Sequence, residues 1–268
     1  MGRRALLRSP SAMREETAES PDWRDAAAYA PLLDADRSLF AWEWLRRDAG
    51  YCAAAEQALY RRAAHGARPA AAAFGLVDFE APHRAVPDAR PMWRSDVHPY
   101  VLAVAAKRPA EGADVFDLHL LRAAATIVRD RRGEHLLLSD GLRGIRLDGP
   151  AGALTGEGVS LRYRLEGLAS AERPLLTLRR LLALCRTERF SRTLHPNEPR
   201  ARRWILMLRA WDARSAGASQ REIASVLLSR LVESPRWRID EPSLRSQAQR
   251  LVRSARLFAN GGYRALLQ

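Results

Sequence analysis

Apolar and polar residues recur with helical spacing through the C-terminal third of the chain. At about 100° per residue, the stretch from residue 240 to 263 gathers its apolar side chains on one side: Leu244, Ala248, Leu251, Val252, Ala255 and Phe258. The opposite side carries polar and basic residues: Arg245, Ser246, Gln249, Arg250, Arg253 and Arg256. An apolar stripe of this kind lets a helix dock on a small core. The pattern predicts a long final helix with one buried face and one basic face.

Two shorter helices are predicted before the final helix. Trp204, Leu208 and Trp211 recur on one helical face, and Gly217 then interrupts the pattern. Ser219 follows, with Glu222 three residues later, which is the capping-box pattern at the start of a helix. Three helices with a short break before the second are typical of a helix-turn-helix. The link between the second and third helices, residues 229–239, is longer than usual, so we predict a variant of that motif.

The rest of the chain divides into segments that differ in their pattern of apolar, polar and turn-forming residues. We predict a disordered leader over residues 1–20, a helical module over 21–66, a linker that packs only in places over 67–96, and a β-rich segment over 97–168. The last of these shows short apolar runs separated by turn residues, which is typical of a small antiparallel sheet. With the helical domain at 169–268, the predicted fold class is α+β. The helical module is rich in aromatic residues, and most of them are expected in its core: Trp23, Tyr29, Phe40, Trp42, Trp44 and Tyr51.

The net charge of +13 is concentrated at one end of the chain. Residues 171–268 contain 20 arginines against 8 acidic residues, a net charge of +12, which leaves +1 for everything before them. Such asymmetry favours a polyanionic partner for the C-terminal part. Only one of the 44 basic residues is a lysine, so arginine abundance by itself argues little and the placement of the arginines argues more.

The basic face of the final helix has the composition of a helix that lies in a DNA major groove. Arginine and glutamine can make paired hydrogen bonds to guanine and adenine, so Gln249, Arg250 and Arg253 are the candidates for base contacts. Arg245, Ser246 and Arg256 complete that surface, Arg256 as a phosphate contact. The start of the preceding helix presents backbone N–H groups to an anion, which adds a second set of candidates: Ser219, Gln220 and Arg221.

Signals for other classes of protein are poor. The 6 histidines are dispersed, and no spacing of histidine, cysteine and carboxylates suggests a metal site. The glycine-rich stretch at 149–158 lacks the Gly-Lys-Ser/Thr ending of a phosphate-binding loop. No signal peptide or membrane span is evident, and the 2 cysteines are far apart in sequence. We therefore expect a cytoplasmic protein that is not an enzyme and needs no cofactor or metal.

Several stretches resemble a known family of regulators. The sequence PDWRDAAAYAPLLDADRSLFAWEWLRRDAGY is similar to a transcriptional regulator-like domain found in alphaproteobacteria. Three C-terminal stretches, PLLTLRRLLALCRTERF, WILMLRAWDARSAGASQREIASVLL and LRSQAQRLVRSARLFANGGYRALL, resemble the domain usually fused to it, a helix-turn-helix variant formerly of unknown function. Together the matches cover most of the chain from Pro21 onward. Related proteins include excision activators of integrative and conjugative elements, and small relatives of the C-terminal domain act as antiactivators.

The resemblance implies a transcriptional activator that binds double-stranded DNA. RNA polymerase or an antiactivator protein is the expected protein partner, no membrane is involved, and a homo-oligomer is left open. The alternative is a protein-interaction module whose basic helix binds another regulator rather than DNA. Duplex binding by the C-terminal segment 171–268 alone would favour the first interpretation.

Overall fold

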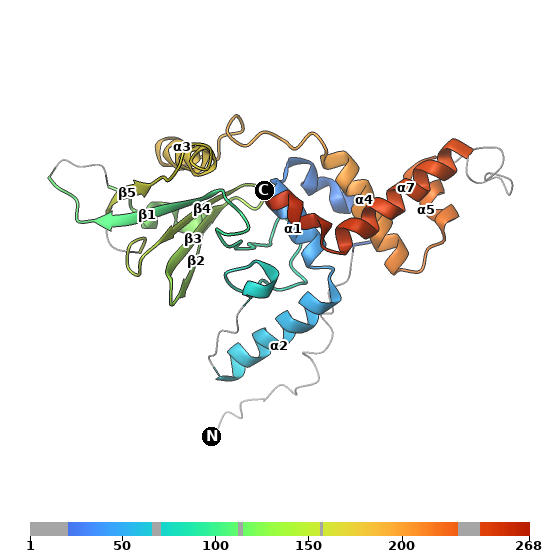
Figure 1. Ribbon diagram of the computed structural model, residues 1–268, viewed down its shortest axis with the longest axis horizontal. Helices are drawn as coiled ribbons and strands as arrows, with labels where there is room; N and C mark the ends of the chain where they lie inside the picture. The colour runs from blue at the N-terminus through green and yellow to red at the C-terminus, as the bar shows by residue number, and fades with distance from the viewer. Residues whose placement is uncertain (1–20, 66–70, 112–114, 156–157, 230–241) are drawn as a thin grey trace, which may run out of the picture.

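A computed structural model describes residues 21–65, 71–111, 115–155, 158–229 and 242–268 of the chain. The predicted leader and most of the predicted link at 229–239 lie outside these ranges. A five-stranded sheet with helix α3 (Glu172–Thr187) forms one end of the molecule (Figure 1). Helices α5 (Gln220–Leu227) and α7 (Pro242–Ala259) form the other end, and α1 (Arg37–Leu45) lies between them. The mixed helical and β architecture confirms the predicted α+β class.

The N-terminal helices are η2 (Ala27–Asp34), α1 and α2 (Ala49–His65). Every aromatic residue predicted for this module is buried, including Trp42 and Tyr51, which are 0% exposed. The core that they form is not confined to the module. Phe40 of α1 meets Trp204 of α4 (Ala201–Ser215) edge to face, with ring centroids 5.0 Å apart.

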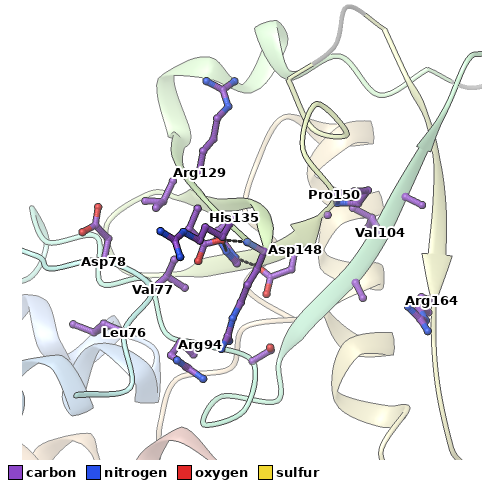
Figure 2. A pocket seen from close by; sticks show the side chains of 18 of the residues that line it. Leu76, Val77, Asp78, Arg94, Val104, Arg129, His135, Asp148, Pro150 and Arg164 are labelled. Carbon is purple, nitrogen blue, oxygen red and sulfur yellow. Dashed lines mark hydrogen bonds and ion pairs between the residues drawn. The ribbon is translucent and has the colours of Figure 1, made fainter. Parts of the chain in front are cut away.

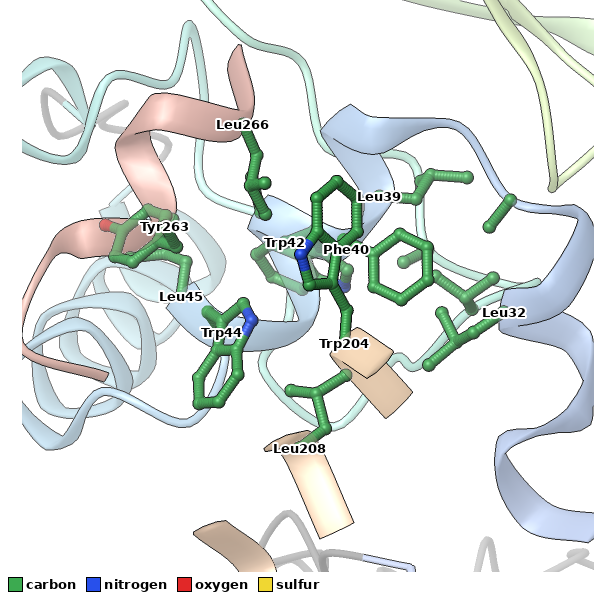
Figure 3. Close-up of a cluster of buried hydrophobic side chains, with 14 of the residues drawn as sticks. Leu32, Leu39, Phe40, Trp42, Trp44, Leu45, Trp204, Leu208, Tyr263 and Leu266 are labelled. Atoms are coloured by element: carbon green, nitrogen blue, oxygen red, sulfur yellow. The ribbon is translucent and has the colours of Figure 1, made fainter. Parts of the chain in front are cut away.

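One hydrophobic core therefore joins the two ends of the sequence. In Figure 3, side chains of α1 lie between Trp204 and Leu208 of α4 on one side and Tyr263 and Leu266 on the other. The latter pair belongs to the terminal 3-10 helix η6 (Gly262–Leu267). The N-terminal module and the C-terminal helices bury much of their apolar surface against each other, so the two share one main core.

The segment 71–96, within the predicted linker, also enters this core. It contains the short helix η3 (Ala72–Phe74), and Leu76, Phe79 and Trp93 are buried among the N-terminal helices. The indole N–H of Trp93 donates to the carbonyl of Ser38, which ties the segment to α1. Apolar residues are spaced irregularly here because the segment packs without forming a long helix or strand.

The sheet has the strand order β2-β3-β4-β1-β5. Its strands are β1 (Val101–Lys107), β2 (Ala125–Asp130), β3 (Gly133–Ser139), β4 (Gly144–Gly149) and β5 (Ser160–Arg164), with helix η4 (Leu118–Ala124) before β2. Neighbouring strands are antiparallel except β1 and β4, which run parallel. The sheet is thus mixed rather than wholly antiparallel, because the chain crosses from β1 to β4 through β2 and β3.

The two faces of the sheet differ in character. Leu102, Leu136 and Leu147 lie on one face and are covered by Leu181 and Leu184 of α3. Because side chains alternate along a strand, the residues between them point to the other face, called the polar face because it carries the charged side chains of the sheet beside apolar ones such as Val101 and Leu137. That face holds Ala103, Ala105, His135, Arg146, Asp148, Arg162 and Arg164.

Candidate nucleic-acid interface

Helix α7 has the two faces that the sequence predicts. Ala248 and Ala255 are buried, and the other four residues of the predicted apolar stripe are half-buried. All six residues of the predicted polar face are exposed: Arg245, Ser246, Gln249, Arg250, Arg253 and Arg256. The exposure pattern confirms how the helix is oriented on the core, because packing follows the 3.6-residue period of the sequence.

Helix α7 is held by close contacts with α4 and α5. Ala248 of α7 meets Ala224 of α5, and both side chains are 0% exposed. Two methyl groups at the contact allow the backbones of the helices to approach closely. Ala255 and Phe258 attach the far end of α7 to the main core, where the Phe258 ring lies 5.6 Å from the ring of Trp44. The basic face is therefore presented by a rigidly supported helix.

The four arginines of α7 make no ion pair with any residue that the structure describes. Elsewhere arginines are commonly paired, as Arg47 is with Asp212. From Arg245 to Arg256 the helix rises about 16 Å at 1.5 Å per residue. That length corresponds to roughly five base-pair steps of 3.4 Å. The row of unpaired guanidinium groups is long enough to follow a short DNA site.

Ser219 and Glu222 satisfy each other's backbone N–H groups at the start of α5. The Ser219 hydroxyl accepts from the Glu222 amide at 3.3 Å, and the Glu222 carboxylate accepts from the Ser219 amide at 2.8 Å. The predicted capping box is thus present. The hydrogen bond from the Ser219 amide holds the pKa of Glu222 below its usual value, so a negative charge lies where a phosphate was predicted. The phosphate role of Ser219, Gln220 and Arg221 stays a prediction.

The turn between α4 and α5 fixes how the two helices lie relative to each other. Gly217 has φ of +79°, a left-handed conformation that glycine adopts without strain. The amide of Ala218 donates to the carbonyl of Ala213 at 2.8 Å, closing the end of α4. Arg214 lies beside this turn and is exposed and unpaired among the described residues. Arg214 is thus a further candidate phosphate contact that was not predicted from the sequence, although its place just before the glycine break was a usable signal.

Buried charges fix α4 to the N-terminal helices. Asp212 of α4 accepts from the Arg47 guanidinium at 2.7 and 2.8 Å and from the Tyr29 hydroxyl at 2.6 Å. Arg209, one turn earlier, donates to the carbonyls of Trp23 and Arg24. Burial raises the pKa of Tyr29, and the Asp212 charge raises it further, so the phenol stays protonated and donates to the carboxylate.

Glu43 extends this network within the N-terminal helices. Burial alone would raise the pKa of Glu43, but the charges of Arg47 and Arg46 outweigh it and lower the pKa. Its carboxylate also accepts from the amide of Val86 at 2.9 Å. Two buried carboxylates, those of Glu43 and Asp212, thus face two buried guanidinium groups. Such a network costs desolvation energy but fixes one geometry, since each charge left alone would be strongly unfavourable.

Comparison with protein families shows a transcriptional regulator with a DNA-binding domain. Residues 166–268 match the family model "T6SS, Transcription factor, DNA binding domain". Residues 22–76 match the model "Proteobacterial transcriptional regulator-like domain". The first match contains α4, α5 and α7, and the second contains η2, α1, α2 and η3.

Two further observations bear on the class of protein. A comparison with curated proteins found no match. Within the described ranges, every helix is too short or too polar to span a bilayer.

Proposed function

We propose that the chain is a sequence-specific transcriptional activator that reads DNA with the exposed face of α7. The observation that carries the proposal is the row of exposed arginines on α7, which find no carboxylate among the described residues. Guanidinium groups held on a supported helix bind phosphates and base edges without first breaking an internal ion pair. The match of residues 166–268 to a DNA-binding domain supports this assignment.

The roles along the helix follow from side-chain chemistry. Gln249, Arg250 and Arg253 occupy the middle of the exposed face and are proposed to contact base edges. A paired contact of this kind contributes about 1–3 kcal/mol of discrimination between bases. Arg245 and Arg256 lie toward its two ends and are proposed to contact phosphates, which adds affinity that falls with salt. In this proposal α4, α5 and α7 act as a helix-turn-helix variant.

Two classes of target gene are proposed for the activator. The family description of the C-terminal domain names a T6SS transcription factor, which favours genes of such a system. The resemblance to excision activators instead favours a gene carried on an integrative and conjugative element. In either case RNA polymerase is the proposed partner of the activator and an antiactivator protein its proposed regulator, with no catalysis by the chain itself. A homo-oligomer would contact two half-sites.

Selection of bound duplexes from a random DNA pool tests whether the exposed face of α7 recognises a specific DNA sequence. The full chain is compared with the double variant Arg250→Ala, Arg253→Ala at about 0.15 M salt. A matched control replaces two exposed arginines away from α7, Arg122 and Arg192, with alanine. We expect the wild type and the control to enrich the same motif and the α7 variant to lose or relax it.

Failure to enrich any motif, with weak binding that vanishes at modest salt, would overturn direct promoter reading and leave the protein-interaction interpretation. A selected motif can then be placed before a reporter gene. An activator raises expression from that promoter in a manner that requires Arg250 and Arg253, whereas reduced expression would contradict the activating role. The genes that carry the motif decide between the two classes of target.

A further inference from the structure

A broad groove of about 1020 Å³ lies on the polar face of the sheet, away from α7. It is bounded by the segment around Leu76 and Arg94, by the turn between β2 and β3, and by β5. Figure 2 shows Arg94, Arg129 and Arg164 around its rim, with His135 and Asp148 at its centre. The volume is at the upper end of the range for small-molecule sites, about 300–1,000 Å³.

Small side chains make the floor of the groove deep. Ala103 and Ala105 of β1 point into it and are paired across the strands with Arg164 and Arg162 of β5. A methyl group fills little of the space above a sheet, so the two arginines of the neighbouring strand border an open floor. A larger residue at Ala103 or Ala105 would close this space.

The carboxylates in the groove centre are already satisfied by internal partners. Asp148 accepts from His135 Nδ1 at 2.8 Å and from Arg146 at 2.9 Å. Asp130 accepts from His135 Nε2 at 3.1 Å. His135 and the Arg146 guanidinium are thus the nearest partners of these carboxylates, and the charge of Asp130 also acts on Arg94 at the rim.

Six arginines line the groove, and half of them have no carboxylate partner within the part of the chain that the structure describes. Arg94, Arg129 and Arg164 pair with Asp96, Glu134 and Glu166. Three others are exposed and make no ion pair with any described residue: Arg131, Arg132 and Arg162. Positive charges concentrated in a groove attract anions more strongly than the same charges on a flat surface.

The unpaired arginines stand at opposite ends of the groove. Arg131 and Arg132 form the turn between β2 and β3, whereas Arg162 lies on β5 at the far edge of the sheet. Three to four strand spacings separate them, about 14–19 Å at roughly 4.8 Å each. These are separations of the backbone, so a single phosphate ion would contact both ends only if the long arginine side chains converged on it. A ligand with negative groups at both ends of an extended molecule needs no such convergence.

We propose that this groove is a binding site for a phosphorylated effector of nucleotide size, a nucleoside polyphosphate or a phosphodiester-linked dinucleotide. Arg131 and Arg132 bind one phosphoryl group and Arg162 the other end of the molecule. The planar guanidinium fork matches phosphate oxygens in pairs. The site is separate from the α7 surface, so DNA reading and effector binding can be tested independently.

Calorimetric titration of the full chain tests the site, with guanosine 3′,5′-bisdiphosphate and the linear dinucleotide pApAp, which carry phosphates at both ends, as probes in magnesium-free buffer at about 0.15 M salt. We expect at least one probe to bind. The triple variant Arg131→Gln, Arg132→Gln, Arg162→Gln should weaken that binding at least tenfold. The matched control Arg122→Gln, Arg192→Gln and the α7 variant Arg250→Ala, Arg253→Ala should both bind the probe as the wild type does.

Three outcomes would overturn the proposal. The first is that the wild type binds neither probe, and the second is that the control variant weakens binding as much as the triple variant. The third is that the triple variant loses duplex DNA binding to the extent that the α7 variant does, which would make the groove part of the DNA surface. Failure of DNA reading by α7 leaves the titration result unaffected.

Discussion

Arg47 and Asp212 form a two-point ion pair although 165 residues separate them in the sequence. The guanidinium Nε and Nη2 donate to the two carboxylate oxygens at 2.7 and 2.8 Å. Both side chains are almost fully buried. The pair joins the regulator-like domain to α4 of the DNA-binding domain, and α4 in turn packs against α7.

Removing the carboxylate at this junction should destabilise the whole fold. Asp212→Ala leaves the Arg47 charge and the Tyr29 hydroxyl without their buried acceptor, which costs about 3–5 kcal/mol. Urea unfolding followed by circular dichroism measures the loss. The control Glu166→Ala breaks the exposed pair with Arg164, whose side chains are 76% and 74% exposed, and should change stability by less than about 0.5 kcal/mol. Equal effects of the two changes would contradict the role of the buried pair.

The isolated C-terminal segment should not fold as the full chain does. Cutting the chain before residue 166 exposes Trp204, Leu208 and Tyr263, which are buried against α1 and its neighbours. An exposed apolar surface of that kind favours aggregation over a stable fold. Size-exclusion chromatography and thermal unfolding of residues 166–268 check this. A monomer with a cooperative transition would show that the shared core is dispensable, and duplex binding by that fragment could then be used as a test.

The contact between α5 and α7 leaves no room for a larger residue. Ala248→Leu inserts three carbon atoms against Ala224 and should cost about 1–3 kcal/mol through overpacking. It should also weaken DNA binding, because α7 must move away from α5. Gln247→Leu is the matched control, since Gln247 is exposed on the same helix. If both variants keep wild-type stability and affinity, α7 is not positioned by this contact.

Phosphate contacts and base contacts on α7 should differ in their response to salt. Arg256→Ala removes one proposed phosphate contact, so the slope of log affinity against log salt should fall by about 0.9 while the selected motif stays the same. Arg250→Ala should instead relax the motif at one position. Fluorescence anisotropy across a salt series, with the selected duplex and a scrambled one, separates the two effects. An altered motif in the Arg256 variant would reverse the assigned roles.

Acid should destabilise the protein through His98. Burial lowers the pKa of His98 from 6.5 to about 4, although the hydrogen bond to the Leu267 carbonyl opposes the shift. Between these values the unfolded chain binds more protons, so stability is complete above about pH 6.5 and falls as the pH drops toward 4. The expected contribution is about 2 kcal/mol between pH 7 and pH 5.

The variant His98→Asn separates this effect from other titrations. Its amide can still donate to the Leu267 carbonyl but does not take up a proton, so its unfolding free energy should fall less between pH 7 and pH 5. His135 provides a contrast. Burial opposes its protonation, but hydrogen bonds to Asp148 and Asp130 raise its pKa above 6.5, so its contribution is lost as the pH rises. An unchanged pH slope in the His98 variant would contradict the assignment.

Local patterns predicted residue by residue which side chains of α7 are buried and which are exposed. The 3.6-residue period separates Ala248 and Ala255 from the exposed arginines because a single helix surface meets the core. The capping box at Ser219 and the break at Gly217 are also local, since each depends on a few neighbouring residues. The order in which the predicted strands pair was harder to predict from the sequence. Nothing near β1 in the sequence shows that it pairs in parallel with β4, across two intervening strands.

The α+β class, the amphipathic final helix with its basic face and the concentration of charge toward the C-terminus follow from the sequence alone. Three further features emerge only when the chain is folded: Arg47 meets Asp212, the segment 71–96 packs into the core, and Arg131 and Arg162 border one groove. The reason is physical. Helical period and capping depend on residues within a turn or two, whereas buried ion pairs and grooves depend on which distant surfaces exclude water together.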